Sequence, residues 1–197
     1  MAESMGARGP GRPRSERSRR AVLTAARELL TDRGLPALSM DDIAARAGVS
    51  KNTIYRWWPT KAAVLMDAFT DAFADRMATP DDGDALTRLR IQVRRVAQLM
   101  NTPEARRPFI ALVAAAQHDP ELATALRERF IDGRRADVSR LIAAGITDGQ
   151  LPADLDADVV IDLIYGALYY RLLVSGAPID PAYADRLVHA LAPVLRT

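Results

Sequence analysis

Residues 39–57 read SMDDIAARAGVSKNTIYRW, and the order of serine, glycine and apolar residues in them predicts two short helices. Ser39, followed three residues later by Asp42, is typical of a capping box, so a short helix is expected directly after Ser39. Gly48 suits the left-handed backbone of a sharp turn, and Ser50 is a good N-cap for a second helix. Two short helices around a glycine turn predict a helix-turn-helix.

The second helix, over about residues 51–57, has an apolar and a polar side. Ile54 is expected to face inward with Val49, against Ile43 of the preceding helix. The outward side chains can hydrogen-bond to base edges in a major groove, and they are Lys51, Asn52, Thr53 and Arg56. Double-stranded DNA is therefore the expected partner. The alternative is a three-helix bundle that serves only as a scaffold.

Groups that can contact DNA phosphates lie at the end of the same helix and directly after it. Tyr55 can donate a hydrogen bond from its hydroxyl and Trp57 from its indole N–H. Thr60 and Lys61 begin a fourth helix, where free backbone N–H groups favour an anion. Tyr55, Trp57, Thr60 and Lys61 are therefore candidate phosphate contacts.

The rest of the chain continues the helical pattern. A first helix is expected from Glu16 to Gly34, and the fourth from Thr60 to about Ala78. Further helices are expected at about 84–100, 103–117, 120–147, 157–175 and 181–195. The predicted fold is all-α, with about nine helices in an N-terminal helix-turn-helix module of three helices and a larger helical ligand-binding and dimerisation domain. The expected divisions are a disordered basic arm at 1–15, the helix-turn-helix at 16–61, a connecting helix and linker at 62–83, and the larger domain at 84–197.

Charge is unevenly spread along the 197 residues. Residues 1–61 hold 12 basic and 6 acidic side chains, whereas residues 62–197 hold 15 basic and 19 acidic ones. Only the first third is therefore expected to meet a polyanion. Arg12 and Arg14 in the arm suit a narrow minor groove, since Gly11-Arg12-Pro13 is similar to the centre of an AT-hook. The alternative is a solvated basic tail.

Composition narrows the function classes. The chain has no cysteine, hence no disulfide or thiolate metal site. The longest apolar run, residues 159–174, is short and contains Asp162 and Arg171, so no membrane association is expected. We find no catalytic pattern, no metal-ligand cluster and no phosphate-binding glycine loop, so neither a cofactor nor an enzyme is expected. The expected compartment is the cytoplasm.

The stretch 38–61 resembles the signature of the tetracycline-repressor (TetR) family, and the spacing of the first helix is also similar. The family usually has His-Phe or Tyr-Phe where this chain has Trp57-Trp58. The resemblance implies phosphate contacts at Ser39, Ser50, Tyr55, Trp57 and Lys61, and base contacts at Lys51, Thr53 and Arg56. It also implies a homodimeric repressor that binds a palindromic operator and is released by a small molecule.

The larger domain suggests a dimer and a pocket. The expected helix at 157–175 is apolar on all sides, so one side needs a partner beyond the subunit's own core. The predicted dimer interface is Ile161, Ile164, Leu168 and Leu172, with Leu187 and Leu191 from the next helix. The predicted pocket for a small, largely apolar effector of unknown identity is Met100, Phe109, Val113, Gln117, Phe130 and Tyr169. Each of these is also compatible with ordinary core packing.

Two other functions share some of these features. A ligand-independent DNA-binding protein or activator would keep the helix-turn-helix and need no pocket. An enzyme would need a cluster of perturbed ionisable groups in a cleft.

Overall fold

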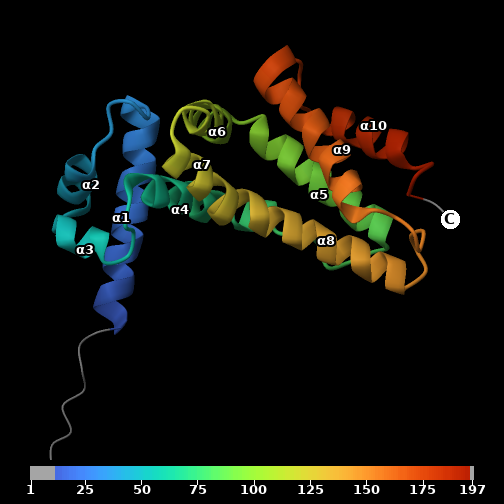
Figure 1. Ribbon diagram of the computed structural model, residues 1–197, viewed down its shortest axis with the longest axis horizontal. Coiled ribbons are helices and arrows are strands. Elements are labelled where there is room, and N and C mark those ends of the chain that lie inside the picture. The colour runs from blue at the N-terminus through green and yellow to red at the C-terminus, as the bar shows by residue number, and fades with distance from the viewer. Residues whose placement is uncertain (1–11, 196–197) are drawn as a thin grey trace, which may run out of the picture.

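The computed structural model describes residues 12–195, with side chains from Glu16 onward. Every regular element in that range is helical, which confirms the all-α prediction. Figure 1 shows α1, α2 and α3 at one end, α5, α8, α9 and α10 at the other, and α4 between them. We call α1–α3 the head and α5–α10 the body.

The head begins with α1 (Arg12–Arg33), whose helical backbone starts four residues before the expected Glu16. α2 (Met40–Ala47) and α3 (Lys51–Tyr55) follow, and α4 (Lys61–Phe73) leaves the head. The buried side chains of Ile43, Ile54 and Trp58 hold these helices together. α3 is one half-turn shorter than predicted, because the chain turns at Arg56 and Trp57 to reach α4.

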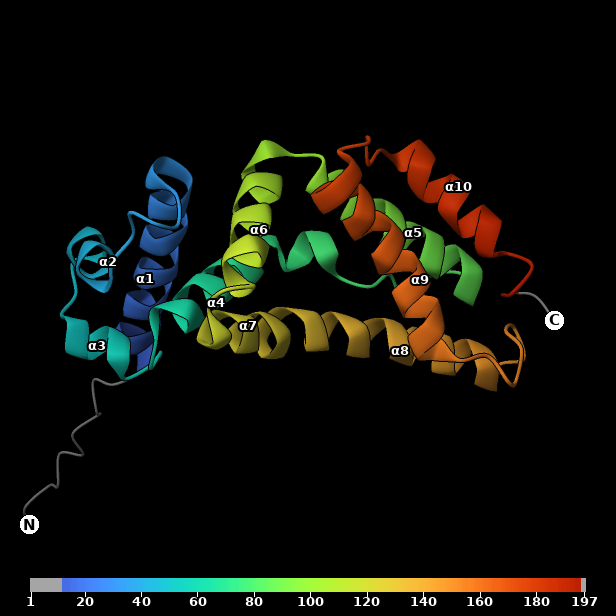
Figure 2. The ribbon, with the colours of Figure 1, turned by 45° about the horizontal axis from the view of Figure 1, so that its top comes forward.

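The body contains the remaining helices, which Figure 2 shows from a second side. Their bounds are α5 (Ala85–Met100), α6 (Pro103–Ala116), α7 (Pro120–Leu126), α8 (Asp132–Thr147), α9 (Ala157–Tyr170) and α10 (Pro181–Leu191). The single helix expected over 120–147 is continuous, and it contains the π-helical turn Arg127–Ile131 between α7 and α8. A second π-helical turn, Arg171–Ser175, extends α9. Such turns insert an extra residue and occur frequently at functional sites.

Aspartates cap four of the body helices, and Asp119 and Asp180, each followed by a proline, are two of them. The Asp119 carboxylate accepts hydrogen bonds from the backbone N–H groups of Glu121 and Leu122, each at 3.0 Å. Asp180 accepts one from Tyr183 at 2.7 Å. Thr102 differs, because its hydroxyl donates to the carbonyl of Leu99 at 2.8 Å and does not cap α6.

An aromatic cluster joins α4 to the body. The ring of Phe69 on α4 lies 5.7 Å from that of Phe109 on α6 and 5.4 Å from that of Phe130 in the π-helical turn. Phe109 lies 5.6 Å from Tyr169 on α9. Ring pairs at these separations attract one another beyond the burial of their surface. The end of α4 is therefore held by three parts of the body at once.

α8 contacts α5 closely at Gly145. A Cβ atom there would lie 2.5 Å from the Cβ of Ala85 and 2.8 Å from a methyl carbon of Leu151. We expect Gly145→Ala to destabilise the protein by about 1–3 kcal/mol through overpacking. Gly133→Ala on the same helix meets nothing within 4 Å, so it should stabilise by about 0.5–1 kcal/mol. Urea unfolding of both variants tests this, and equal stabilities would contradict the close contact.

Within residues 12–195, no helix combines the length and the apolar character needed to cross a membrane.

Candidate nucleic-acid interface

The successive helices α2, α3 and α4 each begin at an N-cap residue with a hydroxyl side chain. The Ser39 hydroxyl accepts from the Asp42 N–H at 3.2 Å while the Asp42 carboxylate accepts from the Ser39 N–H at 3.1 Å, which confirms the capping box. Ser50 accepts from Thr53 at 3.2 Å, and Thr60 from Ala63 at 3.1 Å. These caps leave other first-turn N–H groups unpaired within each helix, and such groups bind anions.

The turn between α2 and α3 depends on Gly48. Its φ is 66°, and its N–H donates to carbonyls at the end of α2. A residue with a side chain is strained in this left-handed conformation. Gly48 therefore ends α2 and directs α3 outward.

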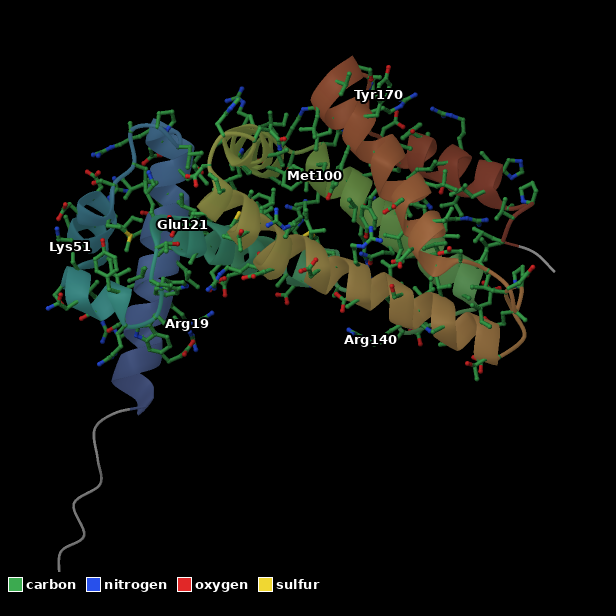
Figure 3. The ribbon with its side chains drawn as sticks, in the orientation of Figure 1. Arg19, Lys51, Met100, Glu121, Arg140 and Tyr170 are labelled. Atoms are coloured by element: carbon green, nitrogen blue, oxygen red, sulfur yellow. The ribbon has the colours of Figure 1, made fainter. Side chains whose placement is uncertain are left out.

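α3 presents a polar face to solvent. Lys51, Asn52 and Arg56 are exposed, and Lys51 lies at the outer edge of the head (Figure 3). Thr53 is half-buried, and its hydroxyl shares a hydrogen bond of 2.9 Å with that of Ser50. Three of the four side chains predicted to read bases are thus exposed to solvent, and the Thr53 methyl remains for an apolar contact.

Lys51 is held by a carboxylate in the absence of DNA. Its Nζ lies 2.9 Å from an Asp41 carboxylate oxygen on α2. A hydrogen bond from Lys51 to Asp41, and the charge of Asp41, raise the pKa of Lys51. This ion pair would have to break for Lys51 to make the base contact predicted from the sequence.

Lys61 and Trp57, two of the predicted phosphate contacts, are less free to donate hydrogen bonds than expected. Lys61 is exposed, but its Nζ donates to the carbonyl of Leu38 at 3.0 Å, which fastens the α1–α2 loop to α4. Two of its three N–H groups remain for a phosphate. The Nε1 of Trp57 is buried and bonds to no residue that the structure describes. In this conformation Trp57 cannot donate to a phosphate, because protein atoms cover the nitrogen.

A partly buried hydrogen-bond network behind α3 was not predicted from the sequence. The Trp58 indole N–H donates to Asp67 on α4 at 2.7 Å, and Arg129 donates to the other oxygen of that carboxylate at 2.9 Å. Thr70 adds a hydrogen bond to the carbonyl of Arg129 at 3.3 Å. Asp67 therefore joins the loop after α3 to the π-helical turn of the body. The one sequence signal was an acid within the otherwise apolar first half of α4.

Arg12 and Arg14, predicted to enter a minor groove, lie in the first turn of α1. Their side chains fall outside the described residues.

Comparisons with known proteins agree with this geometry. Residues 22–68 match the profile of bacterial regulatory proteins of the tetR family, and residues 79–191 match that of the tetracyclin repressor-like C-terminal domain. The chain belongs to the TetR family. Its relatives are DNA-binding transcriptional regulators and not enzymes.

Several TetR-family proteins resemble the chain over nearly its whole length. An uncharacterized HTH-type transcriptional regulator, YdeS of Bacillus subtilis, is 41% identical, covering 90% of this chain and 89% of the relative. A DNA-binding transcriptional repressor named TetR from Mycobacteroides abscessus is 30% identical, covering 92% and 95%. The crystal structure of the TetR family transcription regulator SCO0332 has a TM-score of 0.80 at 36% identity, covering 91% and 99%.

The predicted effector pocket of this TetR-family body is largely filled. Met100, Phe109 and Phe130 are buried in the core. Gln117 is exposed, and its amide donates to the carbonyl of Val113 one turn earlier at 3.1 Å, so it does not line a pocket. The prediction for Gln117 is wrong because the residue follows the last turn of α6 and faces solvent. Val113 and Tyr169 are half-buried.

The predicted dimer interface on α9 is also wrong. Ile161, Ile164, Leu168 and Leu172 are buried inside the subunit, each with at most 4% of its surface exposed. Leu187 and Leu191 on α10 are half-buried against the same core. The four side chains that the subunit itself buries cannot pack against a partner, whereas the interface role of Leu187 and Leu191 stays a prediction.

The opposite face of α9 carries the exposed apolar surface. Val159, Leu163, Tyr170, Leu173 and Val174 are between 39% and 71% exposed, and we call them the apolar stripe. They and Gly166 recur at steps of about three to four residues, so they share one side of the helix. Tyr170 lies near the outer end of this side (Figure 3). An apolar helix face this large is typical of an interaction surface.

Proposed function

We propose that this TetR-family regulator is a cytoplasmic homodimeric repressor that binds a palindromic operator and is released by a small, largely apolar molecule. The exposed polar face of α3 carries the proposal, because Lys51, Asn52 and Arg56 extend from a capped helix-turn-helix. One α3 from each subunit would enter successive major grooves about 34–36 Å apart.

The repressor and effector parts of the proposal draw support from relatives. The 30% identical TetR of Mycobacteroides abscessus is named as a repressor. FadR of Bacillus subtilis, whose structure was solved with stearoyl-CoA, has a TM-score of 0.67 and 19% identity to this chain. That likeness shows a shared fold. We therefore propose a small-molecule effector for this chain, but not stearoyl-CoA in particular.

Operator reading is tested by selecting DNA fragments with the purified protein and then measuring affinity for the selected site. We expect Arg56→Ala to weaken binding by about 1–3 kcal/mol and to relax preference at one base pair. Arg140→Ala is the matched control, because Arg140 is an exposed arginine of α8 far from the head (Figure 3). Loss of affinity in both variants alike, or in neither, would contradict base reading by Arg56.

Asp41 should restrain DNA binding. Asp41→Asn removes a negative charge beside the expected DNA surface and releases Lys51 from its 2.9 Å ion pair. Because exposed ion pairs contribute only about 0–1 kcal/mol, folding should change little, whereas affinity for DNA should rise at low salt. Titrations at two salt concentrations measure this. Equal affinity of variant and parent at low salt would show that the pair does not oppose DNA binding.

A further inference from the structure

A cavity of about 300 Å³ lies in the seam between α8 and α9. We call it the seam cavity, and it is lined by Ile131, Arg134, Arg135, Asp162, Tyr165, Gly166 and Tyr169. Of the pocket residues predicted from sequence, only Tyr169 is among them. We propose that the seam cavity binds a compact, uncharged aromatic molecule and that it is the effector site. The regulatory role of this ligand rests on the function proposed above, whereas its binding to the cavity does not.

The walls favour a flat ring system. The rings of Tyr165 and Tyr169 lie 6.1 Å apart with an interplanar angle of 43°. Gly166 lies between them in the sequence, and a Cβ atom there would meet nothing within 4 Å. The absence of a side chain leaves open space beside two aromatic faces. Aromatic ligands gain both burial and ring–ring attraction in such a place.

The charges at the cavity are already paired. Arg135 donates to Asp158 at 2.8 Å and also to Asp162. Arg134 donates to the carbonyl of Met77 at 3.1 Å and pairs with Asp137 at 3.2 Å. An anionic ligand would compete with these carboxylates, and a cationic one would lie beside two guanidinium groups. An uncharged ligand avoids both costs.

The two tyrosines supply polar groups without charge. Burial raises the pKa of Tyr169, and burial raises that of Tyr165 against an opposing hydrogen bond with Gln92. Both hydroxyls therefore stay protonated near neutral pH. Neither tyrosine therefore adds a charge to the wall of the cavity, which suits an uncharged ligand.

The cavity has two short connections to α4. Ile131 closes the π-helical turn that contains Arg129, and Arg129 donates to Asp67 of α4. Tyr169 contacts Phe109, whose ring lies 5.7 Å from Phe69 of α4. A ligand that moves either wall therefore acts on the helix that leaves the DNA-binding head.

The test uses two fluorescent probes with one skeleton. N-phenyl-1-naphthylamine is uncharged, and 8-anilinonaphthalene-1-sulfonate is the same molecule with a sulfonate. We expect the full-length protein to bind the uncharged probe at one site per subunit and the sulfonate about tenfold or more weakly, because burying an unpaired charge is unfavourable. Absence of binding by the uncharged probe, or equal affinity for both, would overturn the proposal.

Two glycines of neighbouring helices provide matched variants. Gly166→Leu fills the cavity from α9, so probe affinity should fall about tenfold or more. Gly133→Leu adds the same side chain to an exposed position of α8 outside the lining, so it should bind like the parent. Circular dichroism and sedimentation check the folding and assembly of Gly166→Leu. Ile131→Ala, on the opposite wall and outside the apolar stripe, should weaken binding about tenfold through lost contacts.

The experiments distinguish failure of the proposed binding site from failure of the proposed release of DNA. Parent-like probe binding by both Gly166→Leu and Ile131→Ala would show that the cavity is not the site. Probe titration into the protein–operator complex is a separate measurement. If the probe occupies the cavity and leaves operator affinity unchanged, the binding site stands and release of DNA by this ligand fails.

Discussion

Replacing Leu163 by glutamate is expected to convert the proposed dimer into monomers. Leu163 is 46% exposed at the centre of the apolar stripe. In a dimer that covers the stripe, the new carboxylate would be buried twice, once from each subunit, with no cation on the stripe to pair it. Burying an uncompensated charge costs several kcal/mol, which exceeds the gain from any single apolar contact.

Loss of the dimer should also weaken binding to the operator. Two linked heads bind a palindrome as one unit, and such linkage raises overall affinity by about 10²–10⁴ over a single head. Leu163→Glu should therefore weaken operator binding by a factor in about that range while α3 itself stays intact. Sedimentation gives the mass, and titration of full-length and half-site DNA gives the two affinities.

Ala143→Glu is the control for this experiment. Ala143 is exposed on α8, outside the apolar stripe, so the variant adds the same charge without reaching the expected interface. It should remain dimeric and bind the operator like the parent. A dimeric Leu163→Glu protein would show that the stripe is not the contact surface.

The apolar stripe also shows a limit of the sequence reasoning. Residues 157–175 are apolar on all sides, from which we expected one side of the helix to need a partner beyond the subunit's own core. Periodicity could not decide which face is internal, because Ile161 and Leu163 are equally apolar. The packing of α8 and α10 against α9 decides it, and it covers the face that contains Ile161 and leaves Leu163 exposed.

Patterns among residues close together in the sequence predicted the structure better than anything that depends on residues far apart. The capping box at Ser39, the glycine turn at Gly48 and the outward face of α3 depend on residues within a few positions of each other, so sequence alone predicted them. Gln117 and Trp57 were placed wrongly, since their surroundings come from the end of a helix and from the packing of the head. The contact between Asp67 and Arg129 joins residues 62 apart, for which no periodic pattern exists.

Asp67→Ala is expected to destabilise the protein chiefly through Trp58. Trp58 is only 1% exposed, and its N–H would lose its acceptor at 2.7 Å. A buried donor without an acceptor costs about 1–3 kcal/mol. Arg129 would lose an ion pair as well, but its side chain is 33% exposed and water can replace the carboxylate. Exposed pairs of that kind contribute about 0–1 kcal/mol, so the Trp58 hydrogen bond should dominate.

A double-mutant cycle separates the two contributions. Trp58→Phe removes the N–H together with its need for an acceptor, so adding Asp67→Ala to it should cost much less than Asp67→Ala alone. Arg129→Met should cost less than about 1 kcal/mol by itself. Urea unfolding at one fixed protein concentration gives the four free energies, because the stability of a dimer depends on concentration.

The same variants test whether the network carries the ligand's effect to the head. Arg129→Met removes the side-chain link between the π-helical turn and Asp67 of α4, while Trp58 keeps Asp67 as its acceptor. If the link transmits displacement from the seam cavity, this variant should bind probe and operator separately like the parent, yet show a coupling between them that is smaller by about 0.5–2 kcal/mol. Because coupling is reciprocal, probe affinity measured with and without operator must give the same value as operator affinity measured with and without probe. An unchanged coupling in Arg129→Met would show that the effect travels by the other contacts with α4, which are the hydrogen bond of Thr70 to the Arg129 carbonyl and the aromatic contacts of Phe69.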